Sequence, residues 1–253
     1  MSGHSKWSTI KHKKAAKDAR RGKQWAKLIR QIEVAAREAN TADPDTSPSL
    51  ALAVQKAKDA EVPKDTIEKA CKRGGGELDG AASYEAAQYE GYAAGGVAVL
   101  VDCLTDNRNR TASDIRNAFS KAGGNLAEPG AVAFLFSRRG QVLLDAQGVE
   151  EEDVMVAGLD AGLEDVEVDD EVITAWCDAS DVGDLRSALE DAGLTVRSSG
   201  SPMVPASTVP LEQPKEARKV LGLLDLLEDN DDVQDVWANF DIPDEVVAEL
   251  EDA

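Results

Sequence analysis

Cationic side chains crowd the start of this chain and are interleaved with an indole, a combination that suits contact with phosphate groups. The first thirty residues contain 10 Lys or Arg against a single acidic residue, Asp18. Clustered cations displace counterions from a nucleic-acid backbone, and an indole among them can stack on a base or a sugar. We therefore predict a nucleic-acid-binding arm whose contact residues include Lys6, Trp7, Lys11, Lys13, Lys14, Lys17, Arg20, Arg21 and Lys23.

A charge run of this kind also has a simpler interpretation, namely a solvated basic helix face that Trp7 anchors to a helical bundle. The distribution of charge along the whole chain argues against it. Residues 1–76 contain 17 basic and 9 acidic side chains (+8), whereas residues 77–253 contain 11 basic and 39 acidic ones (−28), which together give −20. Such segregation predicts a basic binding segment attached to an acidic body.

A second pair of cations, Arg108 and Arg110, lies in the segment Asp106–Thr111, which leaves an apolar strand and enters a predicted helix. Backbone amides and guanidinium groups at a helix N-terminus can bind a phosphate or another anion. Equally, Asp106 or Asn109 could cap the helix while the two arginines pair with neighbouring acids. The sequence leaves both interpretations open.

Patterns typical of catalysis or of a metal site do not occur in the sequence. Both histidines, His4 and His12, fall in the basic arm, and GxSxG, HExxH and Walker A motifs are absent. Three widely separated cysteines, Cys71, Cys103 and Cys177, match neither a zinc site nor a disulfide framework and favour a reducing compartment. We predict a protein that is not an enzyme, with no catalytic or metal-binding residues, no cofactor and no small-molecule substrate.

The elements that must position the basic residues begin with a helical part. Apolar residues fall at helical spacing from Trp25 to Ala39, Ser47-Pro48 supplies a helix start, and a third helix is expected over 64–73. The second helix should bury a stripe of Leu50, Ala53, Val54 and Ala57, and the glycines from Gly74 should form a linker. This predicts a basic helical domain over residues 1–78.

Strands alternate with helices in the remainder of the chain, which predicts α+β domains built on antiparallel sheets with helices. The opening ββα segment and the closing βαβ segment would complete one sheet, so that residues 79–130 and 203–253 form a discontinuous domain. Residues 131–202 would form an inserted acidic domain. Strands are expected at 87–92, 97–104, 132–136, 141–144, 165–168, 171–177, 195–197, 204–209 and 233–239, and helices at 111–122, 151–161, 182–192 and 214–228.

Four segments of the chain match family motifs, namely Gly3–Asp18, Pro63–Ile67, Tyr89–Tyr92 and Leu104–Thr111, of which the first and the last are long and unusual. On these segments the chain resembles the YebC/PmpR family from residue 2 to about residue 240. The resemblance implies three domains, a helical one followed by two α+β domains around a cleft, in a cytoplasmic, DNA-binding transcriptional regulator. Other members imply a role in translation, because a mitochondrial relative activates translation and bacterial members have been assigned ribosome-associated relief of stalls at proline-rich nascent sequences.

Three functions remain after these observations. The first is a transcriptional regulator that binds duplex DNA through the basic arm, although Gln24 and Gln31 offer too few groups for base readout. The second is a ribosome-associated factor whose arm contacts ribosomal RNA. The third is a non-enzymatic scaffold whose acidic body recruits a basic partner. No apolar run approaches the about 18 residues of a membrane span, so we expect a cytoplasmic protein without a membrane partner, and the net charge of −20 favours a monomer.

Overall fold

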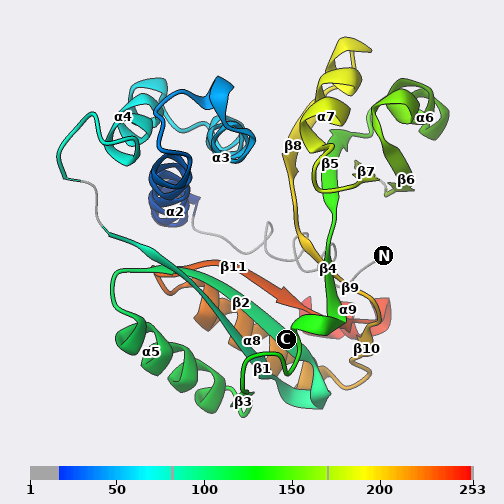
Figure 1. Ribbon diagram of the computed structural model, residues 1–253. Helices are drawn as coiled ribbons and strands as arrows, with labels where there is room; N and C mark the ends of the chain where they lie inside the picture. Colours follow the sequence, from blue (N-terminus) through cyan, green and yellow to red (C-terminus); the bar gives the residue numbers. More distant parts are fainter. Residues whose placement is uncertain (1–16, 81–82, 170, 252–253) are drawn as a thin grey trace. The chain divides into compact units, whose positions relative to one another are not determined.

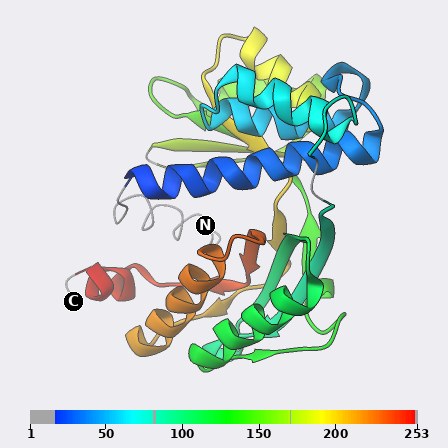
Figure 2. The same cartoon turned by 90° about the vertical axis from the view of Figure 1, so that its left-hand side faces the viewer.

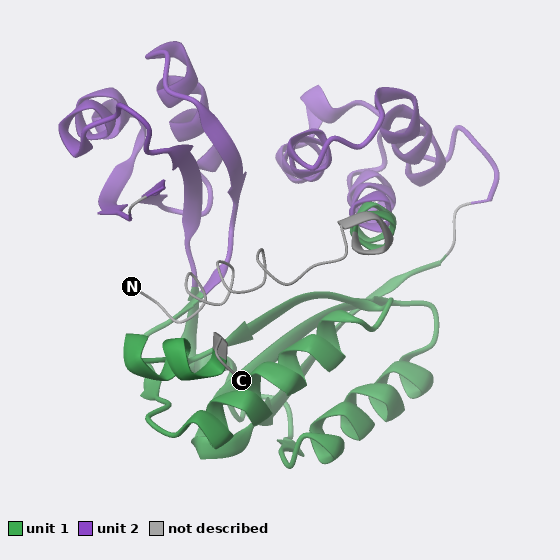
Figure 3. Ribbon diagram, turned by 180° about the vertical axis from the view of Figure 1, so that it is seen from behind, with its two compact units in different colours: residues 1–27, 82–137, 204–253 green, residues 28–81, 138–203 purple. Residues whose placement is uncertain are grey.

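A computed structural model describes residues 17–80, 83–169 and 171–251. The chain forms two compact units, each assembled from segments far apart in the sequence (Figure 3). Unit 1 contains residues 1–27, 82–137 and 204–253, and unit 2 contains residues 28–81 and 138–203. The mixture of helices and antiparallel sheets confirms the α+β class, while the predicted domain boundaries at residues 78, 130 and 202 stay predictions.

The helical part is close to the sequence expectation. The side chain of Ser47 accepts a hydrogen bond from the Leu50 N–H, and Pro48 occupies the first helical position, as predicted. The predicted stripe of the second helix is buried in full. The helices are α2 (Lys17–Ala39), which is continuous in Figure 2, α3 (Pro48–Asp59) and α4 (Lys64–Gly74).

The glycines after the third helix do more than link two domains, which corrects the sequence expectation. Gly74 is the last residue of α4 and is buried, because a Cβ there would collide with the backbone of Glu33 and with Ala36 on α2. Gly75 approaches the backbone of Ala42 just as closely. Arg73 adds an ion pair to the buried carboxylate of Glu33, so the end of α4 is fixed against α2.

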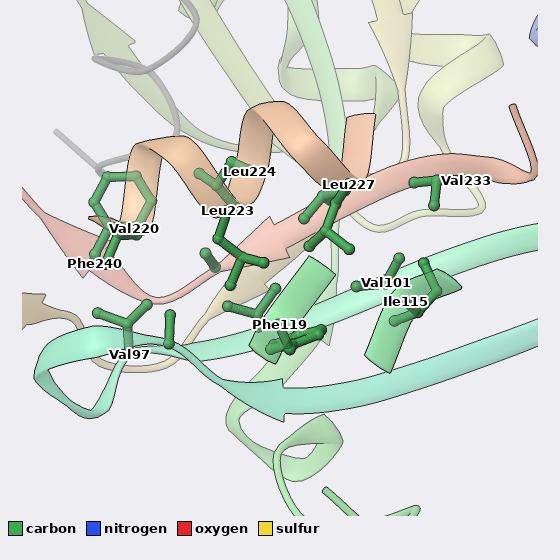
Figure 4. Packing of buried hydrophobic residues seen from close by; sticks show 14 of the residues in the cluster. Val97, Val101, Ile115, Phe119, Val220, Leu223, Leu224, Leu227, Val233 and Phe240 are labelled. Carbon is green, nitrogen blue, oxygen red and sulfur yellow. The ribbon is translucent and has the colours of Figure 1, made fainter. Parts of the chain in front are cut away.

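One antiparallel sheet and two helices form the core of unit 1. The sheet has the order β11-β2-β1-β3, so a strand near the end of the chain pairs with one from the first hairpin (Figure 1). Helices α5 and α8 lie side by side on one face of this sheet, and their apolar residues interlock with it (Figures 2 and 4). These elements are β1 (Glu85–Tyr92), β2 (Ala98–Thr105), β3 (Asn125–Leu126), β11 (Val233–Ala238), α5 (Arg108–Lys121) and α8 (Pro214–Glu228).

Two of the predicted strands are wrong, and some short elements in unit 1 and at its boundary with unit 2 were not expected. Residues 133–135 form a single 3-10 turn, and the predicted strand over 204–209 divides into two short strands. In both places apolar residues occur without continuous strand pairing, and the sequence pattern does not distinguish these cases. The elements are β4 (Phe136–Arg138), β9 (Met203–Pro205), β10 (Val209–Pro210), β12 (Phe240–Asp241) and α9 (Asp244–Glu251).

The mixed part of unit 2 has the element order βαββαβ and an antiparallel sheet in the order β6-β7-β5-β8, which is the ferredoxin-like arrangement. Its core contains Val142, Ile173 and Leu185, all fully buried. The elements are β5 (Gly140–Asp145), α6 (Glu151–Gly158), β6 (Leu163–Val168), β7 (Val172–Cys177), α7 (Val182–Asp191) and β8 (Val196–Gly200).

A buried ion pair joins the two parts of unit 2. The guanidinium of Arg186 on α7 donates to both carboxylate oxygens of Asp59 on α3, at 2.7 and 2.9 Å, and to the hydroxyl of Ser199 on β8 at 3.0 Å. Both charged side chains are nearly buried, with 12% and 11% of their surface exposed. Because a bidentate pair of this kind fixes both distance and orientation, α3 is held in one register on the sheet.

The segment Tyr89–Tyr92 on β1 holds the loop that follows β3. The carboxylate of Glu90, only 6% exposed, accepts hydrogen bonds from the N–H groups of Gly130, Val132 and Ala133 at 2.6 to 2.8 Å. Gly91 leaves no room for a side chain, because a Cβ there would lie 2.5 Å from the ring of Phe119. This family-like segment therefore has a structural role, which is to fix the loop against the sheet.

Burial by itself would raise the pKa of the Glu90 carboxyl, but the three N–H donors lower this pKa below its ordinary value. A lowered folded-state pKa stabilises the protein above the unfolded pKa and loses this effect as the pH falls through the folded pKa. We expect Glu90→Gln to lower the free energy of unfolding at pH 7 by about 1–3 kcal/mol, because the amide group turns a donor toward other donors. The difference from the unsubstituted protein should shrink below about pH 4.

Urea unfolding at neutral and acidic pH measures this effect. Glu85→Gln is the matched control, since Glu85 is an exposed carboxylate on the same strand. A Glu90→Gln deficit that is constant over this pH range, or one that Glu85→Gln reproduces, would contradict the assignment.

Candidate nucleic-acid interface

The basic arm is placed only in part. Lys6, Trp7, Lys11, Lys13 and Lys14 lie outside the described residues, and Lys17 and Arg20 belong to the first turns of α2. The predicted residues whose side chains are described begin with Arg21. Its guanidinium lies over the ring of Trp25, 5.0 Å from the ring centroid, in a cation–π contact along one face of α2.

Lys23, another predicted contact residue, approaches the end of α8 within unit 1. Its ammonium donates to the carbonyl of Asp229 at 3.3 Å and lies 3.5 Å from the carboxylate of the same residue. One helical turn later, Lys27 donates to the carbonyl of Glu228 at 2.7 Å. The last carbonyls of a helix carry partial negative charge, so both lysines stabilise the C-terminus of α8. Half of the Lys23 side chain stays exposed.

Arg110, the second of the predicted anion-binding arginines, is paired with acids. Its guanidinium donates to Asp106 at 2.8 Å and to Asp232 at 2.7 Å, and these bonds raise the pKa of the guanidinium above its ordinary value. Asp232 is buried and also accepts hydrogen bonds from the hydroxyls of Thr111, at 2.7 Å, and Thr105. The positive charge of Arg110 therefore compensates a buried carboxylate.

Arg108 lies two residues before Arg110 and is exposed at the start of α5. Its backbone carbonyl accepts a hydrogen bond from the hydroxyl of Tyr89, at 3.2 Å. Within the part of the chain that the structure describes, its side chain has no ion pair. Of the two arginines in this segment, Arg108 is the one whose charge can meet an anion from solution.

The predicted caps of this helix are wrong. The side chain of Asn107 caps α5 by accepting a hydrogen bond from the Arg110 N–H at 3.1 Å, and neither Asp106 nor Asn109 does so. The helix starts one turn earlier than the apolar spacing predicts, because its first turn, Arg108–Arg110, is entirely polar.

A shallow groove between α5 and α8 gathers further cations that the sequence analysis did not single out. It encloses about 470 Å³, and the charged residues that line it are all basic: Lys121, Arg218 and Lys219. These side chains are exposed and have no ion pairs among the described residues. Two glycines, Gly123 and Gly222, keep the groove open. We call this feature the α5–α8 groove.

The amino-acid composition of α8 gives no indication of this groove. Lys215, Arg218 and Lys219 on α8 are balanced in number by Glu216, Asp225 and Glu228 on the same helix, so α8 has no net charge. Only the contact with α5 brings two of these cations beside Lys121. A helical-wheel analysis that followed charge along with hydropathy would have found the basic face of α8.

The three cysteines are buried and unpaired. Burial raises the pKa of Cys103 to about 12 and that of Cys177 to about 11, and it also raises the pKa of Cys71. Their thiols are accordingly held in the protonated, unreactive form. In the described residues no group of three His, Cys, Asp or Glu side chains has the geometry of a metal site.

Within residues 17–80, 83–169 and 171–251, none of the helices combines the length and the apolar character that a bilayer-spanning segment requires.

Comparison with known proteins places both parts of the chain in one family. Residues 5–77 match the model of the TACO1/YebC N-terminal domain, and residues 84–240 match the model of the TACO1/YebC second and third domain. A protein of Beutenbergia cavernae is 55% identical over the full length of both chains, and one of Thermobifida fusca is 53% identical over 99% of this chain and all of that protein. Both carry the name "Probable transcriptional regulatory protein".

A solved structure shares the fold. It is the crystal structure of a conserved hypothetical protein, Aq1575 from Aquifex aeolicus, which is 43% identical in sequence. The two structures superpose with a TM-score of 0.81 over 91% of this chain and 94% of the other.

The bonds around Asp232 predict which acids stabilise unit 1. We expect Asp232→Ala to lower the free energy of unfolding by about 2–4 kcal/mol, because it leaves Arg110, Thr105 and Thr111 without their common acceptor. Asp106→Ala removes the exposed partner of the same arginine and should cost less than about 1 kcal/mol. Urea unfolding of both variants measures the difference, and equal losses would show that the buried network has no special role.

Proposed function

The chain belongs to the TACO1/YebC family, and from this membership and its charge distribution we propose that it regulates gene expression by binding duplex DNA through its basic N-terminal segment. The protein acts in this proposal as a binding protein and not as an enzyme. Its proposed contact residues are the arm cations, namely Lys6, Lys11, Lys13, Lys14, Lys17, Arg20, Arg21 and Lys23.

The observation that carries the proposal is the segregation of charge. Ten cations against one acid in the first thirty residues stand in a chain whose residues 77–253 have a net charge of −28. The acidic body is repelled by a nucleic acid, so the binding free energy has to come from the basic segment. In this arrangement the acidic surface faces away from the DNA and opposes non-specific adhesion along it.

Contact with the sugar-phosphate backbone accounts for this segment better than base readout does. The described first part of α2 offers Lys and Arg side chains, and Gln24 is the one amide side chain within residues 17–30. Backbone contacts position a protein on the duplex without selecting a sequence. We therefore propose recognition by charge and by duplex shape.

The α5–α8 groove offers a second site for phosphate contact on unit 1. Lys121, Arg218 and Lys219 converge on it from two helices, and Arg108 lies at the other end of α5. These cations interrupt an otherwise acidic body. A nucleic acid bound there would meet three positive charges in a space of about 470 Å³.

We place the protein in the cytoplasm. Support comes from the three free, buried thiols, since a reducing compartment keeps such cysteines unpaired.

The salt dependence of binding tests the arm directly. Six phosphate contacts predict a slope of log K against log salt of about −5 for a duplex of about 30 base pairs. Neutralising Lys11, Lys13 and Lys14 together, each to Gln, should bring the slope about 3 units closer to zero and weaken binding by about tenfold or more at low salt. Fluorescence anisotropy of the labelled duplex measures both quantities.

The matched control neutralises three exposed lysines on α4, with Lys64, Lys69 and Lys72 each replaced by Gln. This variant has the same net charge as the arm variant and should keep the slope of the unsubstituted protein. An equal loss in both variants would show that total charge alone drives binding. Tight binding to a ribosomal RNA stem-loop with none to the duplex would favour the translation factor, and binding to neither would favour the scaffold.

A further inference from the structure

Helix α6 and the 3-10 turn that follows it, Leu159–Ala161, carry an exposed apolar patch on the mixed part of unit 2. Three large apolar side chains lie mostly outside the core, with 49% of Met155, 82% of Val156 and 70% of Leu159 exposed. Residues three and four positions apart on a helix are neighbours, so the three side chains form one surface. We call this surface the α6 patch.

The opposite face of α6 fixes the orientation of this patch. Val154 is fully buried in the domain core, and Gly158 lies so close to Leu185 and Leu163 that a Cβ would approach their side chains to 2.9 and 3.0 Å. The helix therefore cannot roll to bury the patch without breaking this packing. The packing of the opposite face therefore keeps the patch on the surface, and a contiguous exposed apolar patch is typical of an interaction site.

The surroundings of the α6 patch are strongly anionic. Residues 140–200 contain 17 acidic side chains and two basic ones, Arg186 and Arg197. Both arginines are already paired with acids, Arg186 with Asp59 and Glu190 and Arg197 with Asp145. Acidic residues precede the patch along α6, at Glu151, Glu152 and Asp153, and Asp160 follows it.

We propose that the α6 patch is a docking site for a cationic amphipathic helix of a partner protein. Apolar side chains of such a helix would cover Val156 and Leu159, while its Lys or Arg side chains would meet Glu151, Glu152 and Asp160. Charge complementarity selects this occupant. The mixed chemistry requires a partner with both an apolar stripe and flanking cations.

The same charges disfavour the other occupants. A second copy docked through the same patch would bring two domains of like charge together, each with a formal −15 over residues 140–200. A nucleic acid or an anionic lipid surface would be repelled by the acidic rim. A nucleic acid would also leave the aliphatic side chains without an apolar counterpart.

A designed peptide tests the proposal on the full-length protein. The probe is a fluorescein-labelled peptide of about 18 residues, made only of Leu and Lys, with Leu at helical spacing. The control peptide has the same composition in scrambled order. We expect the ordered peptide to bind more tightly, and Val156→Asn with Leu159→Asn to weaken its binding by about tenfold or more, because two buried aliphatic contacts are lost.

Both substituted side chains are exposed, so the double variant should unfold at the same urea concentration as the unsubstituted protein. The control is Leu78→Asn with Phe134→Asn, which removes two exposed apolar side chains elsewhere and keeps the same net charge. Equal binding of the ordered and scrambled peptides, or equal binding by the patch variant and the control, would reduce the interaction to charge alone and overturn the proposal. Duplex DNA binding by the patch variant should be unchanged, which separates this inference from the proposed function.

Discussion

A single buried carboxylate connects two of the three chain segments from which unit 1 is built. Asp232 precedes the last strand of the sheet, and its Oδ2 accepts hydrogen bonds from Thr105 at the end of β2 and from Arg110 and Thr111 in the first turn of α5. A buried charge is tolerated only where it is fully hydrogen-bonded and paired, so these partners must be assembled together. The strand pairing of β11 with β2 and the start of α5 therefore depend on one another. The family-like segment Leu104–Thr111 is accounted for by this requirement, with Arg108 as the cation that the network does not use.

The sequence correctly predicts the helices and turns whose ends and buried faces are marked by residues within the same segment. Helix α8 begins and ends where the pattern places it, because Pro214 marks its first turn and the apolar stripe through Val220, Leu223 and Leu227 is regular. Ser47-Pro48 predicts the start of α3 for the same reason. In the turn before β2, Gly95 and Gly96 have φ angles of 70° and 77°, which L side chains rarely adopt. Each of these signals is local, so no knowledge of distant contacts is needed.

The sequence-based predictions fail where contacts between residues far apart in the sequence determine the local structure. The loop over residues 128–133 is shaped by three hydrogen bonds to Glu90, forty positions away in the sequence for Gly130, and its apolar residues imitate a strand. The roles of Arg110 and Arg108 depend on Asp232, which no spacing rule connects with them. The α5–α8 groove likewise exists only because α5 and α8 lie side by side. In each case the surroundings of a charged group are set by the fold, and the charge of the residue alone does not predict them.

The pairing of β11 with β2 also sets the order in which the chain can fold during synthesis. The β1–β2 hairpin leaves the ribosome early, but its sheet is completed by a strand that begins more than about a hundred residues later. At about 5–20 residues per second the hairpin waits for roughly 5–25 seconds with its apolar face covered only by α5, without α8 and β11. Within this interval the segment of residues 138–203 is translated, which belongs to unit 2 and is highly acidic. Its like charges keep neighbouring nascent chains apart, so the acidic domain protects the unfinished sheet from aggregation until the C-terminal segment arrives.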